Sequence, residues 1–235
     1  MSATLRIAIL EPGAPPRDLR PRFGAYGDMV ARLLGEDFAA EPFDVRKGRY
    51  PEGQDWDGYV ITGSAAGVYD PDPWIPDLKA WVRDTAGTAP MVGICFGHQL
   101  MAEAFGGRVV KSPKGWGVGL QTYDLVSPPD WIDAGAKTMT LPVSHQDQVV
   151  EVGEEARVIG GSDFCPFGFL AYPAIKAASM QPHPEFDPAF AVALIDTRAD
   201  GPLTPEHAAA AIASLSGAND NARVADWLRR FLQTG

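Results

Sequence analysis

One cysteine lies between two glycines, at the point where an apolar run of the sequence meets a helical pattern. Cys95 is the centre of the sequence Gly-Ile-Cys-Phe-Gly at residues 93–97. Residues 90–94 are typical of a short buried strand, and residues 96–105 have the apolar spacing of a helix. Such a strand-to-helix turn needs glycines because the backbone approaches closely on both sides. The pattern predicts a nucleophile at Cys95, whose thiolate form is favoured by the helix N-terminus.

A free cysteine is also often a small buried hydrophobic residue, and a second motif favours the chemical interpretation. Residues 181–185 read Gln-Pro-His-Pro-Glu. The prolines disfavour helix, so we expect an extended segment in which His183 and Glu185 point the same way. A strand at residues 175–180, parallel to the one before Cys95, would place both motifs at one edge of a sheet. His183 would then be a general base oriented by Glu185.

Four ordered blocks within about the first 195 residues resemble the class I glutamine amidotransferases. The resemblance is strongest to the glutaminase domain of GMP synthase and its stand-alone relatives. The blocks are residues 60–68, the Cys95 turn, residues 143–149 and residues 181–185. The resemblance implies a Cys95-His183-Glu185 triad that hydrolyses the side-chain amide of glutamine through a γ-glutamyl thioester.

The tetrahedral intermediate of such a reaction needs two backbone donors. One is the N–H of Phe96, the residue after the nucleophile. The other is expected from the small residues of the turn at 62–67, where the family motif maps the donor to Ser64. Relatives commonly have Gly-Gly-Pro where this chain has Gly-Ser-Ala at residues 63–65, so the role requires backbone dihedrals that a serine tolerates. The alternative is an ordinary strand-to-helix loop.

The resemblance also implies a clamp for the α-amino and carboxylate groups of the substrate. Its members would be Gly63, Gln99, Ser144 and His145, together with the backbone up to Asp147. Many relatives have glycine at the position of Gln146, which would reshape the clamp. We interpret His145 as a structural histidine in a tight loop rather than as a second base.

Composition predicts a soluble enzyme domain. The 235 residues are 46% apolar, and no run of eighteen apolar residues is present. The formal charge of −10 opposes binding to nucleic acid or anionic lipid. The two cysteines form no disulfide framework, and no signal peptide is recognised, so we expect a cytoplasmic protein. No histidine or cysteine cluster has metal-ligand spacing, and we expect neither a metal nor a cofactor.

Strand patterns alternate with helical patterns over the first half of the chain. Strands are expected at residues 5–10, 43–45 and 59–62, and helices at 26–34 and 74–83. Alternation predicts a doubly wound, mostly parallel α/β fold, which the resemblance specifies as flavodoxin-like. Short strands within residues 108–172 predict appended antiparallel strands.

The chain divides into a catalytic domain at residues 1–195 and a C-terminal extension at residues 196–235. Helices are expected in the extension at residues 205–215, with Thr204 as N-cap, and at residues 223–232. They would pack back on the catalytic domain or, alternatively, form a contact between copies in a homo-oligomer.

Three functional classes remain open. A glutaminase would supply ammonia to a separate synthetase, since no synthetase domain follows. A γ-glutamyl peptide hydrolase would use the same thioester with an amino acid or peptide as the leaving group; residues 114–119 resemble a segment of plant γ-glutamyl peptidases. A non-catalytic binding protein on the same fold is disfavoured by the intact triad.

Overall fold

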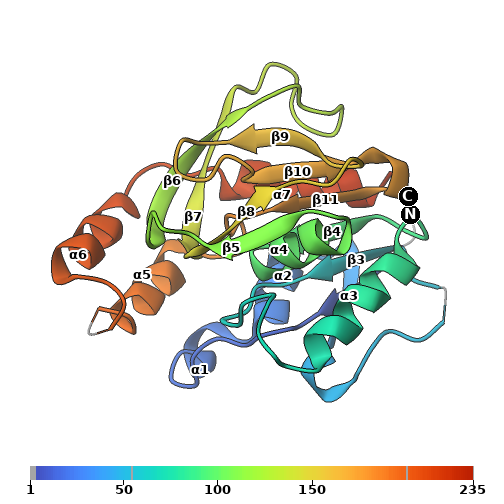
Figure 1. The fold of residues 1–235 in the computed structure, drawn as a ribbon, viewed down its shortest axis with the longest axis horizontal. Helices are drawn as coiled ribbons and strands as arrows, with labels where there is room; N and C mark the ends of the chain where they lie inside the picture. The colour runs from blue at the N-terminus through green and yellow to red at the C-terminus, as the bar shows by residue number, and fades with distance from the viewer. Residues whose placement is uncertain (1–3, 54, 200, 235) are drawn as a thin grey trace.

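A mixed sheet forms the centre of the protein (Figure 1). The computed structural model describes residues 4–53, 55–199 and 201–234. Within them, the strands of the main sheet have the order β2-β1-β3-β4-β11-β10-β9-β6-β7. The first five are parallel to one another, and the last four form antiparallel pairs, as does the separate pair β5 and β8. The predicted fold class, a mostly parallel core with appended antiparallel strands, is confirmed.

The elements follow the sequence in a regular order. The strands are β1 (Leu5–Leu10), β2 (Phe38–Phe43), β3 (Gly58–Ile61), β4 (Met91–Ile94), β5 (Arg108–Lys111), β6 (Gly117–Leu125), β7 (Thr138–His145), β8 (Asp147–Glu151), β9 (Arg157–Gly161), β10 (Phe169–Tyr172) and β11 (Ala177–Met180). The α-helices are α1 (Arg20–Phe23), α2 (Tyr26–Leu34), α3 (Trp74–Thr85), α4 (Phe96–Ala104), α5 (Pro188–Asp196), α6 (Pro205–Ser214) and α7 (Asn221–Leu232), and two 3₁₀ turns are η1 (Val45–Lys47) and η2 (Pro173–Ile175).

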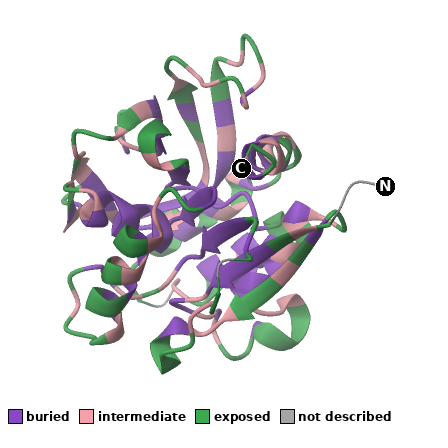
Figure 2. Cartoon of the chain, turned by 90° about the vertical axis from the view of Figure 1, so that its right-hand side faces the viewer, coloured by how far each residue is buried: buried purple, intermediate pink, exposed green. Residues whose placement is uncertain are grey.

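Helices cover both faces of the parallel strands. Successive side chains of a strand point to opposite faces, and in β1 Ile7 and Ile9 join one core while Ala8 and Leu10 join the other. Helices α2 and α7 pack on the first face, and α3 and α4 pack on the second. The central strands are therefore buried on both sides (Figure 2). This explains why their sequences are continuous apolar runs without polar alternation.

The two C-terminal helices lie where the sequence predicts them. Thr204 caps α6 by accepting a hydrogen bond from the backbone N–H of His207 at 3.2 Å. In α7, the predicted apolar face is buried, and Trp227 is completely inaccessible to solvent. Arg229 ties α7 to α2 by donating to the carbonyl of Leu33 at 2.7 Å. The division of the chain at residue 195 stays a prediction, but α7 supplies part of the core that covers the central sheet.

One predicted strand is misplaced. The sequence suggested a strand at residues 43–45, whereas β2 ends at Phe43 and η1 begins at Val45. The strand pairs with β1 only and forms an edge of the sheet. An edge position tolerates Pro42 because its missing N–H would face away from the neighbouring strand. The proline and the two alanines obscured this strand in the sequence.

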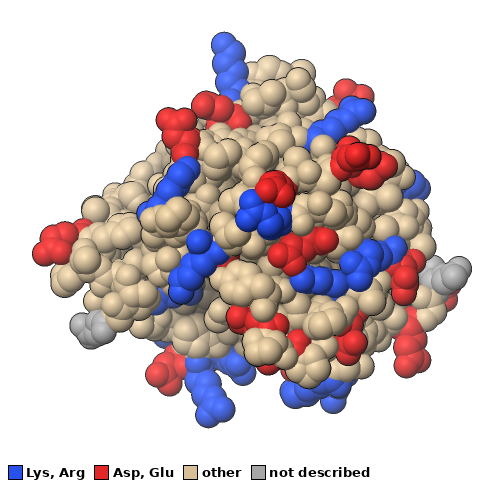
Figure 3. Space-filling model, in the orientation of Figure 1, with Lys and Arg blue, Asp and Glu red and all other residues tan. Residues whose placement is uncertain are grey.

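The surface carries charges of both signs. On the face shown in Figure 3, lysine and arginine side chains are interspersed with aspartate and glutamate. No helix among the described residues is both long and apolar enough to cross a membrane.

Close packing between β3 and α4 leads to a first prediction. A Cβ added at Gly97 would lie 2.3 Å from the carbonyl oxygen of Ile61, a backbone atom that cannot move without shifting β3. We therefore expect Gly97→Ala to lower the free energy of unfolding by about 1–3 kcal/mol. Gly201→Ala is a matched control, because its Cβ would lie 3.7 Å from the carbonyl oxygen of Arg198, an ordinary van der Waals contact. Thermal unfolding of both variants tests this; equal melting temperatures would contradict it.

Candidate active site

Cys95 occupies a strained turn between β4 and α4. Its backbone angles are φ 53° and ψ −102°, in a region that residues other than glycine rarely adopt. The turn is fixed on both sides. The N–H of Cys95 donates to the carbonyl of Met180 at the end of β11 at 2.8 Å, and its carbonyl accepts from Gln99 at 3.0 Å. The predicted need for glycine also holds at Gly93, where an added Cβ would lie 2.6 Å from the sulfur of Met101.

His183 and Glu185 form a buried pair beside this turn. The two motifs meet because β11 is parallel to β4 and ends at the same edge, with Met180 opposite Ile94. Nδ1 of His183 lies 2.7 Å from Oε1 of Glu185, and both residues are less than 10% exposed. The imidazole also stacks on Phe186, with ring centroids 3.8 Å apart.

Gly63 allows the backbone to approach this pair closely. An added Cβ at Gly63 would lie 3.1 Å from Cε1 of His183 and 3.7 Å from Cβ of Cys95. The imidazole of His183 and the side chain of Cys95 therefore both lie next to Gly63, in the loop that follows β3. Burial lowers the pKa of His183, but the interactions with Glu185 and with Cys95 raise it by more, to about 10. The imidazole ring is thus held in its protonated form beside the thiol.

The segment that carries the pair is turned, not extended as predicted. Residues 181–185 form a bend followed by a turn. The N–H of Phe186 donates to the carbonyl of His183 at 3.4 Å, with Pro184 in the second position of the turn, which proline favours. The prolines exclude helix as expected, but the turn, rather than the alternation of a strand, brings Glu185 back to His183.

The loop after β3 has a conformation that a serine tolerates. Ser64 does not have a positive φ, so a serine can occupy this position where relatives have the second glycine of Gly-Gly-Pro. Its hydroxyl donates to the carbonyl of Pro12 at 3.0 Å and accepts from the N–H of Ala66 at 3.1 Å. Ser64 therefore braces the loop against the segment that follows β1. The N–H of Phe96 is at the start of α4, where a helix has no carbonyl partner for it.

The residues of the predicted substrate clamp lie around Gln99. Its Nε2 donates to the carbonyl of Asp147 at 2.9 Å and to Oε1 of Gln181 at 3.0 Å, so that the side chain is held by the first residue of β8 and by the residue after β11. Ser144 and His145 end β7 beside it. Burial lowers the pKa of His145 to about 4, and its Nδ1 lies 3.1 Å from the carbonyl of Asp147. His145 is therefore neutral near pH 7 and is held by the loop, as expected for a structural histidine.

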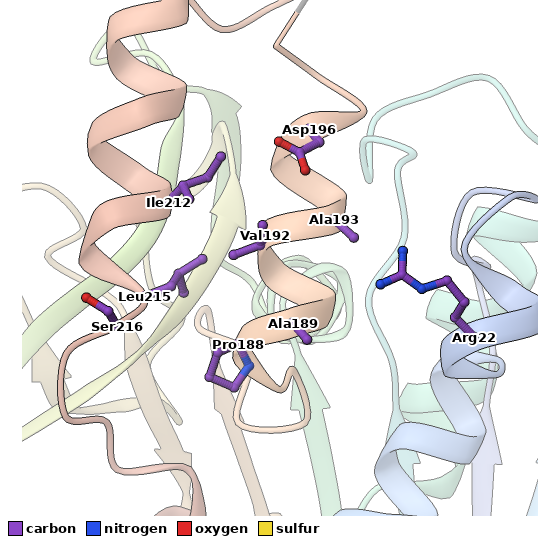
Figure 4. A pocket seen from close by; sticks show the side chains of 9 residues that line it. All are labelled: Arg22, Pro188, Ala189, Val192, Ala193, Asp196, Ile212, Leu215 and Ser216. Atoms are coloured by element: carbon purple, nitrogen blue, oxygen red, sulfur yellow. The ribbon is translucent and has the colours of Figure 1, made fainter.

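These residues surround one cavity of about 440 Å³. Cys95 lies in its wall, together with Ser64, Gln99, Ser144 and His145, so the structure brings these predicted site residues together. A second cavity of about 430 Å³ lies between α1, α5 and α6 (Figure 4). Arg22 approaches it from α1, and the apolar side chains of Ile212 and Leu215 approach from α6. None of the predicted site residues lines this second cavity.

The C-terminal extension contributes two residues that the sequence analysis missed. Arg198, just after α5, lines the cavity of Cys95. Asn221, the first residue of α7, donates from its side-chain amide to the carbonyls of Pro184 at 2.9 Å and Phe186 at 2.7 Å, and thus holds the turn that carries Glu185. No local motif marks either residue, because both depend on how α5 and α7 pack on the sheet.

Comparison with known proteins agrees with this arrangement. The sequence profile of the family described as "Glutamine amidotransferase class-I" matches residues 42–191. The chain belongs to the class I glutamine amidotransferase family, as the resemblance implied.

Individual relatives differ in the share of the chain that they cover. Gamma-glutamyl peptidase 2 of Arabidopsis thaliana is 28% identical over 200 residues, covering 81% of this chain and 80% of that protein. A GMP synthase of Streptococcus mutans is 30% identical over 130 residues, covering 54% of this chain and 24% of that protein. The crystal structure of a glutamine amidotransferase from Thermotoga maritima has the same fold, with a TM-score of 0.77 at 16% identity, covering 99% of this chain and 98% of that one.

The different surroundings of the two cysteines lead to a second prediction. Both thiols are buried, but burial raises the pKa of Cys165 to about 12, whereas Cys95 borders a cavity. Iodoacetamide at neutral pH should therefore modify Cys95 well before Cys165. Peptide mapping by mass spectrometry measures both sites. Cys165→Ala should keep the rapid labelling and Cys95→Ala should lose it; equal labelling of both thiols in the folded protein would contradict the assignment.

Proposed function

We propose that the protein is an enzyme that hydrolyses γ-glutamyl amides with Cys95 as its nucleophile. The observation that carries the proposal is the strained Cys95 turn beside the buried His183-Glu185 pair, in the wall of a cavity. Membership of the class I glutamine amidotransferase family and the similarity to a protein named γ-glutamyl peptidase support the same reaction.

Each residue has a defined step in this reaction. The sulfur of Cys95 attacks the γ-carbonyl carbon, and the carbonyl oxygen becomes an oxyanion that the N–H groups of Ser64 and Phe96 stabilise. The C–N bond then breaks, the leaving nitrogen takes a proton from His183, and a γ-glutamyl thioester remains. His183 next takes a proton from a water molecule, whose oxygen attacks the thioester. The C–S bond then breaks, glutamate leaves and loses its carboxyl proton to solvent, and the sulfur of Cys95 is free again beside the imidazolium of His183.

Glu185 acts on this cycle through His183. It is buried and acts as the acceptor for Nδ1, which leaves Nε2 for the thiol and the leaving group. Gln99, Gly63 and His145 would line the site of the γ-glutamyl group, and Ser144 would lie at its boundary with the leaving group. The hydrogen-bonded arrangement of His183 and Glu185 beside Cys95 favours an enzyme over a binding protein. With glutamine the leaving group is ammonia, whose transfer to a separate synthetase stays a prediction, as do the cytoplasmic location and a homo-oligomer.

A third prediction tests the base and its orienter. His183→Ala should lower kcat by roughly 10²–10⁴-fold, the usual contribution of a general acid-base group. His207→Ala, at an exposed position of α6, is the matched control and should leave the rate unchanged. Hydrolysis of a γ-glutamyl amide is measured. A fully active His183→Ala variant would contradict the assignment, and His145 would become the next candidate.

Glu185→Gln should retain more activity than His183→Ala and should alter the pH dependence. Below about pH 10, His183 keeps the proton that the leaving group requires, so activity is expected to fall only as pH rises through that value. The substitution removes a negative charge that raises the pKa of His183, so the alkaline fall should move to lower pH. Profiles of kcat/KM against pH for both proteins test this, and coincident alkaline limbs would contradict it.

A fourth prediction concerns the leaving group. The cavity of about 440 Å³ includes Trp116, from the segment that resembles plant γ-glutamyl peptidases. We expect the isolated protein to hydrolyse some γ-glutamyl peptide or amine faster than glutamine. Mass spectrometry of the products from glutamine and several γ-glutamyl dipeptides measures the preference. Turnover of glutamine alone, or turnover that begins only when a co-purifying synthetase is added, would favour the glutaminase alternative.

A further inference from the structure

Arg198 brings a positive charge into the cavity of the proposed active site. It follows α5 in a turn of the C-terminal extension. Its guanidinium donates from Nη1 to the hydroxyl of Ser144 and lies over the ring of Trp116, 4.6 Å from the ring centroid. An arginine held by stacking and by one hydrogen bond has lost much of its freedom and keeps further N–H donors for a ligand. The side chain is therefore positioned before any ligand arrives.

No carboxylate pairs with this charge among the described residues. None of the ion pairs within residues 4–53, 55–199 and 201–234 includes Arg198. The side chain is half-buried, and burial lowers its pKa, which indicates that desolvation of the cation is not offset by a nearby carboxylate. A ligand carboxylate would supply the missing charge, in the bidentate geometry that a guanidinium favours.

The other charged residues of the cavity form a separate group. Asp70, Lys111 and Asp147 line it together, and the pKa of Asp147 responds to the charges of the other two. This group contains both signs, which suits the α-ammonium and α-carboxylate of a γ-glutamyl substrate. Gln99, fixed on the carbonyl of Asp147, lies at the same end.

Arg198 lies instead on the side of His183. Its partner Ser144 is two residues along β7 from Pro142, whose carbonyl accepts from the N–H of His183 at 2.8 Å, and its charge acts on Tyr26 and on Cys95. Tyr26 stacks on Phe186 with ring centroids 5.9 Å apart, and Phe186 stacks in turn on His183. His183 is the group that protonates the leaving nitrogen in the proposed reaction. A cation on this side is therefore placed for a group beyond the scissile bond, where glutamine has only an NH₂.

We propose that Arg198, held by Trp116 and Ser144, binds the carboxylate of the leaving amino acid, so that the preferred substrates are γ-glutamyl amino acids. The inference rests on the proposed function and deepens it, because it names the substrate class of that site. Ammonia and simple amines lack the carboxylate and would offer the arginine no anion to bind.

Two substrates that differ only in this carboxylate provide the test. We expect kcat/KM for γ-glutamylglycine to exceed that for γ-glutamylglycinamide by roughly 10- to 100-fold, the range typical of a hydrogen bond to a charged group. Arg198→Met should bring the ratio close to one, and Arg198→Lys should retain part of it. Arg22→Met removes an exposed guanidinium at the second cavity and should leave the ratio unchanged.

The outcomes separate the inference from the reaction on which it rests. A ratio of the two kcat/KM values near one in the unmodified protein overturns the role of Arg198. This measurement does not depend on whether a variant folds. Equal losses on both substrates in Arg198→Met also overturn it, because the arginine would then bind the α-carboxylate or support the loop.

If neither substrate is hydrolysed, the proposed reaction fails, but the inference is still tested by binding. Calorimetry in a Cys95→Ala background compares the affinities for γ-glutamylglycine and its amide. Tighter binding of the acid that disappears in Cys95→Ala/Arg198→Met supports the carboxylate site. Equal affinities for the acid and the amide overturn it.

Discussion

The hydrogen bond from the N–H of Cys95 to the carbonyl of Met180 joins the two halves of the proposed active site. It joins the last residue of β11 to the first residue after β4, and so continues the parallel pairing of these two strands. Strand β4 leads into the strained turn of Cys95, and strand β11 leads into the turn that carries His183. The cost of such a backbone conformation is of order 1–3 kcal/mol, so the surrounding packing must hold it. Gly93 and Gly97 permit that packing, because neither position has room for a Cβ.

The C-terminal extension completes the site from a distance in sequence. Helix α7 covers one face of the parallel sheet, and its first residue, Asn221, holds the turn around Glu185 by two hydrogen bonds. Its neighbour Asp220 accepts from the N–H of Thr140 at 2.7 Å, which ties the same helix end to β7. The loop before α6 supplies Arg198. Residues 196–235 therefore form part of the proposed active site.

Short sequence patterns predicted the features that depend on interactions between residues close together in the chain. The Gly-x-Cys-x-Gly turn needs close backbone approach, and both of its flanking elements lie where their apolar spacing placed them. Alternation of strands and helices similarly predicted the parallel core. The pairing of His183 with Glu185 was expected from an extended segment, and it exists for a different reason, since a proline turn folds Glu185 back. Arg198 and Asn221 were not predicted, because their positions follow from tertiary packing alone.

Direct detection of the covalent intermediate would test the central claim. During turnover of γ-glutamylglycine, acid quenching followed by mass spectrometry should show the peptide that contains Cys95 heavier by one γ-glutamyl group. The adduct should be absent from the Cys95→Ala variant. Steady hydrolysis without any adduct, or an adduct on another residue, would contradict the assignment of Cys95 as the nucleophile.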